Sequence, residues 1–188
     1  KDGVLKYAYT TSWGTSTRMI GGLIMVHGDD RGLVLPPKVA PVQVMILPIA
    51  QHKEGVLEKA NEIFAELKAA GLRVELDDRE NQSAGWKFNE CELKGIPVRL
   101  EIGPKDIEKG TVVLVRRDTL EKTFAPMENL AKTIQDLLAD IHASMLEQAR
   151  KRRDERITEA ADFETFTEGV QKGFVRAMWC GESECEAE

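Results

Sequence analysis

A nearly continuous apolar run from Val42 to Ile49, in which Gln43 is the one polar residue, is followed at once by a helical pattern and most constrains how this chain can fold. A strand that is apolar on nearly every residue is typical of one buried on both faces of a parallel sheet. The next segment, from about Glu54 to Ala70, carries its apolar residues at helical spacing. A buried strand followed by an amphipathic helix favours an α/β arrangement.

The same alternation continues for about 100 residues. The pattern predicts further strands at Leu72–Leu76, Ile96–Ile102 and Thr111–Val115, and helices at Ala84–Leu93 and from Met127 to about Met145. No helical pattern separates the last two strands, so we expect them to form an antiparallel pair. Residues 41–145 therefore read as one α/β domain with a mixed sheet.

The segments on either side read differently. Residues 1–40 contain a strand-like stretch, Tyr7–Trp13, and then a helix from about Arg18 to Val26 that is apolar nearly all round and is expected to be buried. Asp29-Asp30-Arg31-Gly32 reads as a polar turn after that helix. Residues 146–188 begin with a charged helical tail. The chain starts without Met and stops abruptly, so we expect a piece of something larger.

Charge and composition exclude several classes of protein. The chain has 26 Lys and Arg against 32 Asp and Glu, a net charge of −6. This balance argues against a nonspecific nucleic-acid coat, which needs a broad basic face, but allows a local basic groove. Uncharged stretches fall far short of the roughly 20 residues of a membrane span. Three cysteines make no disulfide framework, which favours a reducing, cytoplasmic location.

Two features outside the central domain could carry chemistry. Arg18 stands where a polar strand end meets an apolar helix, where it could bind an anion such as a phosphate at the helix N-terminus or pair with a carboxylate. Cys180 and Cys185 have a C-x4-C spacing that fits half of a structural zinc site, although two cysteines alone make a weak site and the residues by themselves favour free thiols.

Several strings of this sequence resemble prolyl-tRNA synthetase, of the archaeal and eukaryotic-like type of this class II family. They are SWGTSTR and HGDDRGLVLPP within residues 9–37, APVQVMILPI at 40–49, and GWKFNECELKGIPVRLEIGP at 85–104. The resemblance extends over essentially the whole chain. It implies the antiparallel end of a catalytic domain at 1–40, an anticodon-binding domain with a five-stranded mixed sheet at 41–145, and part of an α+β zinc-type domain at 146–188.

The resemblance also implies roles for the first segment. Arg18 matches the motif 3 arginine that binds the γ-phosphate of ATP, used with Mg²⁺, while Ser12, Trp13 and Gly14 match the floor of the pocket for proline and its adenylate. Ser16 and Thr17 match hydroxyl positions beside the nucleotide. Motifs 1 and 2 are missing, so this piece is not expected to make prolyl-adenylate, and residues 4–37 should expose apolar surface. The parent is expected to be a homodimeric proline–tRNA ligase.

For the central domain the resemblance implies tRNA-Pro as the partner. Bases in such a site stack on aromatic rings and are read on their edges by charged side chains. Trp86, Lys87 and Phe88 form a compact cluster of these types, unless Trp86 and Phe88 are core residues. Further candidates, expected on one rim with that cluster, are Arg79, Glu80, Glu92, Arg116 and Arg117.

Carboxylates suit guanine, which offers its N1 and N2 donors, and proline anticodons carry two guanines. We therefore predict anticodon recognition by this chain. The alternative is a stand-alone anticodon-binding-like domain that serves as a binding or scaffolding module without catalysis.

Overall fold

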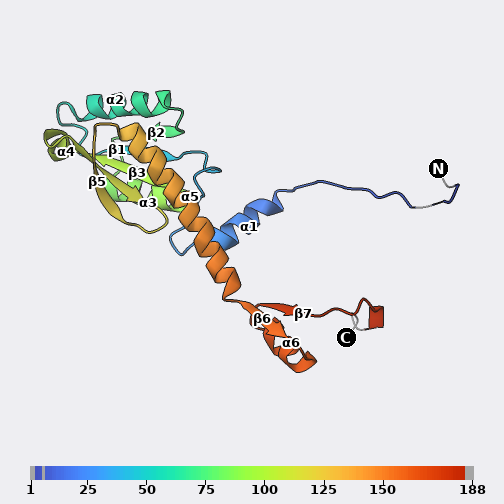
Figure 1. Ribbon diagram of the computed structural model, residues 1–188. Coiled ribbons are helices and arrows are strands. Elements are labelled where there is room, and N and C mark those ends of the chain that lie inside the picture. Colours follow the sequence, from blue (N-terminus) through green and yellow to red (C-terminus); the bar gives the residue numbers. More distant parts are fainter. Residues whose placement is uncertain (1–2, 6, 185–188) are drawn as a thin grey trace.

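A computed structural model describes residues 3–5 and 7–184 of the chain (Figure 1). The central domain contains β1 (Val44–Pro48), α2 (Val56–Ala69), β2 (Val74–Leu76), α3 (Ala84–Lys94), β3 (Val98–Ile102), α4 (Pro104–Glu108), β4 (Thr111–Arg116), β5 (Lys122–Pro126) and α5 (Leu130–Asp154). Before it lies α1 (Arg18–His27), and after it lie β6 (Ile157–Ala160), α6 (Phe163–Val170) and β7 (Phe174–Ala177). Within the described residues, every helix is too short or too polar to serve as a membrane span.

The central sheet has the strand order β2-β1-β3-β4-β5. β1 runs parallel to both β2 and β3, whereas β4 is antiparallel to β3 and to β5. The prediction of a mixed five-stranded sheet with flanking helices is confirmed. The pattern of the residues alone missed β5 and the short helix α4, which separates the antiparallel strands β3 and β4.

The two faces of this sheet are covered unequally. On one face α2 and α5 bury a continuous core, which includes Ile46, Leu100, Leu114 and Ile134. On the other face α3 covers a smaller cluster of Met45, Leu47, Cys91 and Ile96, with Phe88 packed against it. Because helices lie on both sides of it, β1 is buried on all five residues, as its apolar run predicted. The part of the second face over β5 stays open, and Phe124 there is 75% exposed.

Helix α5 continues well past the sheet (Figure 1). Its 25 residues span about 37 Å, and the expected boundary between residues 145 and 146 falls inside it. The helix leads into a small unit in which β6 and β7 pair in parallel and α6 connects them. The earlier helix α1 lies against the outer part of α5, where Arg152 donates a hydrogen bond to the Val26 carbonyl at 2.8 Å.

Two expectations for the first segment are wrong in this structure. The stretch Tyr7–Trp13 is extended but pairs with no strand among the described residues, and Trp13 is 94% exposed. Helix α1 forms where expected, yet none of its residues is buried. A strand needs a neighbouring strand for its backbone hydrogen bonds, and the described part of the chain offers none to Tyr7–Trp13. An apolar helix needs a face to pack against, and in the described part of the chain α1 packs only against α5. Residues 4–37 do expose apolar surface, as predicted.

The segment that follows α1 is fixed to the end of α3. Leu33 N donates to the Leu93 carbonyl at 3.1 Å, and Leu35 N donates to the Gly95 carbonyl at 3.2 Å. The last carbonyls of a helix lack partners within the helix, so these bonds complete α3. Gly32 allows this approach: its φ is +133°, and a Cβ placed there would lie 2.6 Å from Leu93 Cα.

We predict that Gly32→Ala destabilises the chain by about 3 kcal/mol, because it combines an unfavourable φ with backbone overlap. The control is Gly110→Ala, where φ is +63° but no atom lies within 4 Å of the added Cβ. Gly110→Ala should cost only the conformational part, about 1 kcal/mol. Urea unfolding measures both, and equal losses would show that the contact with α3 contributes nothing.

Candidate nucleic-acid interface

The predicted cluster of Trp86, Lys87 and Phe88 lies on helix α3, where the three side chains point in different directions. Ser83 caps the helix by accepting a hydrogen bond from Trp86 N at 3.2 Å, so the cluster sits on the first turn. Trp86 points outward and is 42% exposed, Lys87 is buried, and Phe88 is half-buried against the sheet. The cluster therefore combines one surface aromatic with two side chains that also build the domain.

Lys87 belongs to a buried ion network centred on Asp77. Its Nζ donates to the Asp77 carbonyl at 2.9 Å and lies 3.3 Å from Asp77 Oδ1. Arg79 donates to both carboxylate oxygens of Asp77, at 2.9 and 2.6 Å, and also to Glu90. Hydrogen bonds from Arg79, helped by Lys87, lower the pKa of Asp77 to about 2. Lys87 is thus committed to holding α3 beside the end of β2.

A cavity of about 310 Å³ opens beside this network, at the carboxyl end of β1. In open α/β sheets, crevices at the carboxyl ends of strands form where successive connections cross to opposite faces, as α2 and α3 do here. Arg79 lies over the Trp86 ring with its guanidinium carbon 4.9 Å from the centroid, and Glu80 is exposed at the rim. The lining comprises Leu47, Pro48, Ile49, Ala50, Gln51, His52, Arg79, Glu80, Gln82, Ala84, Lys87 and Phe88.

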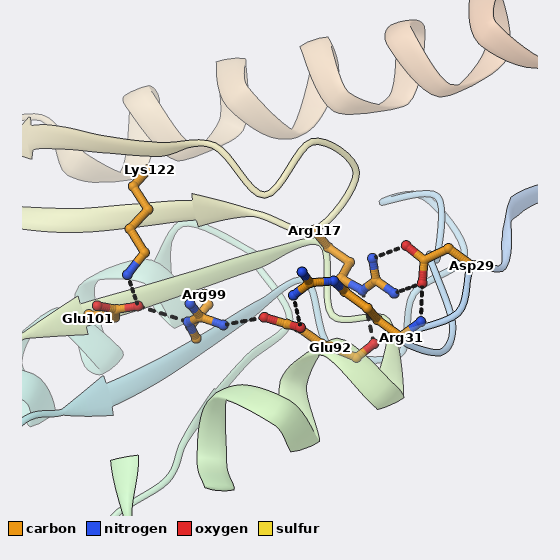
Figure 2. A network of polar contacts seen from close by, with 7 residues as sticks. All are labelled: Asp29, Arg31, Glu92, Arg99, Glu101, Arg117 and Lys122. Atoms are coloured by element: carbon orange, nitrogen blue, oxygen red, sulfur yellow. Dashed lines mark hydrogen bonds and ion pairs between the residues drawn. The ribbon is translucent and has the colours of Figure 1, made fainter. Parts of the chain in front are cut away.

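A chain of alternating charges runs from β5 to α3 along the partly open face of the sheet (Figure 2). Lys122 Nζ lies 3.6 Å from Glu101, which accepts from Arg99 Nε at 2.9 Å. Arg99 also reaches Glu92 at 3.4 Å, and the other Glu92 oxygen accepts from Arg31 at 3.0 Å. We call Arg31, Glu92, Arg99, Glu101 and Lys122 the charge strip.

Phe88 lies against the middle of the charge strip. The guanidinium carbon of Arg99 is 4.2 Å from the Phe88 ring centroid, and Lys122 Nζ is 5.7 Å from it. Both distances fall in the range of cation–π attraction. An aromatic ring, two carboxylates and cations thus meet on one surface. The residues at the two ends of the charge strip, Arg31 and Lys122, are more than half exposed, while Arg99 in its middle is buried.

The candidate Arg116 lies elsewhere, so the expectation of one rim is wrong for it, whereas Arg117 lies beside Glu92. β4 runs antiparallel to β3, so Arg116 stands opposite Val98 at the amino end of β3. Arg79 follows the carboxyl end of β2. Because β2 and β3 both run parallel to β1, Arg79 and Arg116 lie at opposite ends of the strands. Arg116 also faces the other side, where it pairs with Asp118 at 2.8 Å and with Asp140 of α5 at 2.5 Å.

Arg117 joins three parts of the chain. Its buried guanidinium donates to both oxygens of Asp29, at 2.8 and 2.6 Å, and its Nε donates to the Glu92 carbonyl at 2.9 Å. Hydrogen bonds from Arg117 lower the pKa of Asp29 to about 2, despite the opposing effect of desolvation. The predicted turn forms, since Asp29 and Gly32 exchange backbone hydrogen bonds. A buried Arg is costly without such partners, so Arg117 has a structural role.

Arg99, Glu101 and Lys122 were not among the residues predicted for the site. A signal for two of them was present, since Arg99 and Glu101 alternate with Val98, Leu100 and Ile102, which places the charged pair on the face opposite the main core. Charged residues inside a buried strand indicate either a buried ion network or a ligand site. Lys122 could not be placed beside them from the sequence, because it lies on β5, which the residue pattern did not reveal.

The residues matched to an ATP and proline site form no pocket in the described part of the chain. Ser12, Trp13, Gly14 and Ser16 lie on exposed backbone outside any helix or strand, Thr17 is the exposed N-cap of α1, and Arg18 is exposed at the start of that helix. Their hydrogen bonds are local: Arg18 N donates to Ser16 Oγ at 3.3 Å, and the carbonyls of Ser16 and Thr17 accept from the first turn of α1. A triphosphate needs several donors that converge, and these residues do not provide that arrangement here.

The zinc expectation also lacks a donor set. Cys180 is exposed, and Cys185 falls outside the described residues. Across residues 3–5 and 7–184 no three His, Cys, Asp or Glu side chains gather closely enough to hold a metal ion. Cys91 of α3 is buried against Met45 and Leu47, and burial raises the pKa of its thiol to about 12.

Comparison with known proteins gives a consistent result. The family model "Anticodon binding domain" matches residues 43–137. The chain is 56% identical over 189 aligned residues to a proline–tRNA ligase of Acetoanaerobium sticklandii, covering 100% of this chain and 39% of that protein. It is 54% identical over 189 residues to proline–tRNA ligase 2 of Clostridioides difficile, again covering 100% of this chain and 39% of the relative. The chain thus spans about two fifths of the length of these relatives.

Solved structures agree with the sequence relatives. Prolyl-tRNA synthetase from Cryptosporidium parvum, complexed with L-proline and AMP, superposes with a TM-score of 0.87 at 44% identity, covering 91% of this chain and 38% of that one. The same enzyme complexed with halofuginone and AMPPNP gives the same TM-score and identity, over 91% of this chain and 36% of that one.

We predict that stability falls on acidification through the Asp77 network. Because the folded-state pKa of Asp77 is about 2, below its ordinary 3.8, its contribution is complete above about pH 5 and is lost as the pH falls through about 2. Asp77→Asn should cost about 3 kcal/mol at pH 7, since it leaves the buried Lys87 ammonium without a counter-charge.

Thermal unfolding between pH 7 and pH 2 tests this prediction. Asp77→Asn should flatten the acid side of the profile as well as lower the melting temperature at pH 7. Asp136→Asn is the matched control, because Asp136 pairs with Lys132 on an exposed helix surface and should change little. An Asp77→Asn variant with the same acid slope as the parent would contradict the assignment.

Proposed function

Because this chain belongs to the anticodon-binding domain family, we propose that it recognises the anticodon of tRNA-Pro on the sheet face beside α3. The observation that carries this proposal is the charge strip with Phe88 against it. Its carboxylates, guanidinium group and ring are the groups that read and stack single-stranded bases. The opposite face is filled by α2 and α5, which leaves the α3 side as the surface for a ligand.

Glu92 and Glu101 suit guanine in particular. An ionised carboxylate only accepts hydrogen bonds and offers about four lone-pair positions. Glu92 uses one position at each oxygen, for Arg99 and Arg31, and so retains acceptor capacity for the N1 and N2 donors of a guanine. Arg99 is fixed by Glu101 and Glu92, so the acceptors are held in place before RNA arrives.

The cavity beside Trp86 extends this surface. Arg79 and Glu80 line the cavity, and the Arg79 guanidinium lies over the Trp86 ring. Phe88 lines the cavity and also packs against Arg99 of the charge strip. Half-exposed cations on the same side, at Arg31, Lys94 and Lys122, suit the phosphate backbone of the loop. Lys87 supports the site from below through Asp77. This division of work agrees with a net charge of −6, since a few placed cations replace a basic coat.

For the whole protein we propose proline–tRNA ligase activity, with ATP, Mg²⁺ and proline as substrates and metal. Homology to proline–tRNA ligases over the full chain supports this. Arg18 would then hold the γ-phosphate, with Ser12, Trp13, Gly14, Ser16 and Thr17 beside the adenylate and proline. We also propose that the whole protein is a homodimer and that Cys180 and Cys185 are zinc ligands in it. We further propose a cytoplasmic location, because three cysteines make no disulfide framework.

The direct test is titration of this chain with a tRNA-Pro transcript and with one whose two anticodon guanines are replaced by adenines. We expect the altered transcript to bind at least tenfold more weakly, because each well-made pair of base contacts discriminates by about 1–3 kcal/mol. Fluorescence anisotropy at two salt concentrations measures both affinities. Equal affinity for the two transcripts would refute anticodon recognition.

Glu92→Gln tests the acceptor role of the carboxylate. Glutamine keeps the shape of the side chain but has one acceptor and one donor group, so it cannot accept from both donors of a guanine. We expect discrimination between the two transcripts to fall about tenfold, with little change in affinity for the altered one. Lys132→Gln on the exposed surface of α5 is the control. Equal weakening of both transcripts by Glu92→Gln would indicate a merely structural role.

A further inference from the structure

We infer that Arg31, in the segment that follows α1, is a positioning residue for anticodon reading, because it orients the Glu92 carboxylate. Arg31 Nη1 donates to Glu92 Oε2 at 3.0 Å, while Arg99 approaches Oε1 at 3.4 Å (Figure 2). The side chain of Glu92 is 15% exposed and that of Arg31 is 57% exposed. The shorter of the two contacts on Glu92 therefore comes from outside the sheet domain. This inference rests on the proposed function.

The position of Glu92 explains why it needs this partner. Glu92 lies in the last turn of α3, which ends at Lys94. The carbonyl end of a helix carries partial negative charge, so a carboxylate there is disfavoured by about 0.3–1 kcal/mol unless cations offset it. Arg99 is shared with Glu101 and cannot serve Glu92 alone. Arg31 supplies the second cation and draws the carboxylate toward the solvent side of the charge strip.

Arg31 is itself held in register with Glu92. Its backbone N donates to Asp29 Oδ1 at 2.9 Å, and Arg117 grips both oxygens of Asp29. The same Arg117 donates to the backbone carbonyl of Glu92 at 2.9 Å. The backbone and the side chain of Glu92 are thus both tied to the turn at residues 29–32. A shift of that turn would move the acceptor that reads the base.

RNA binding at Glu92 and the position of the turn at residues 29–32 are coupled. RNA that hydrogen-bonds to Glu92 changes the strength of the contact between Glu92 and Arg31. By linkage, a change in the position of the turn alters the affinity for RNA to the same extent. The turn directly follows α1, so the anticodon site senses how that preceding segment is seated. Loss of Arg31 should leave Glu92 leaning on Arg99 and should spoil discrimination more than affinity.

The experiment is a double-mutant cycle in the full 188-residue chain, read out with the unaltered and the guanine-to-adenine transcripts of tRNA-Pro. We expect Arg31→Gln to reduce discrimination about threefold to fivefold, the range of a partly exposed ion pair. In Arg31→Gln/Glu92→Gln, discrimination should equal that of Glu92→Gln alone, because both changes act through one carboxylate. Arg31→Lys should restore most of it, since the contact is a single hydrogen bond.

Lys38→Gln is the matched control, because it removes the same charge from an exposed position farther along the same segment. It should leave discrimination unchanged. If Arg31→Gln weakens both transcripts equally, or if its effect adds to that of Glu92→Gln, Arg31 acts only as a phosphate cation and the inference fails. If the parent chain does not discriminate at all, the proposed anticodon function itself fails, and the two failures are distinct.

Discussion

The buried guanidinium of Arg117 is the contact on which the arrangement of the site depends. It donates to Asp29 of the turn after α1 and to the carbonyl of Glu92 on α3, while the backbone N of Arg117 donates to the carbonyl of Pro97 at 3.0 Å. A buried cation is tolerated only when its donors are satisfied, so these three segments must meet in one geometry for the domain to fold. The backbone bonds from Leu33 and Leu35 to the end of α3 reinforce that geometry.

Because helices cover the two faces of the sheet unequally, one face stabilises the fold and the other carries the proposed binding site. One face carries the large apolar core under α2 and α5, where Ile46, Leu100 and Ile134 are fully buried. The other face carries a small core under α3 and leaves charged side chains at its margin. Arg99 and Glu101 are affordable there because each has a partner and the ring of Phe88 shields Arg99. The same pairing that makes these charges tolerable also fixes acceptors and donors in space.

Local patterns predicted the central domain well. Periodicity revealed the apolar run of β1, the helical stripe of α2 and the strands β3 and β4. These elements are buried by one another within the same domain, so their apolar patterns reflect the structure that forms. β5 was missed because its exposed residues Lys122, Thr123 and Phe124 lack a buried alternation. Tyr7–Trp13 has strand-like composition, but a strand forms only beside another, and none of the described residues provides one.

The site was predictable in composition but not in geometry. Glu92 belongs to the charge strip, Phe88 packs against it, and Trp86 lies under the Arg79 guanidinium, in agreement with the residue types and the family resemblance. Arg116 and Arg117 could not be placed from sequence, since the direction of β4 decides which edge of the sheet they occupy. Residue type makes Lys87 a candidate for contact with the anticodon, and nothing local predicts its burial against Asp77, which depends on how β2 and α3 dock.

Our central proposal is that RNA binds on the α3 side of the sheet. Backbone amide NMR of the labelled chain with an isolated anticodon stem-loop of tRNA-Pro tests this most directly. We expect chemical-shift changes concentrated at Phe88, Glu92, Arg99 and Glu101, and no changes in α2 or on the covered face. Changes centred on α2 or on the outer surface of α5, with β3 unperturbed, would contradict it.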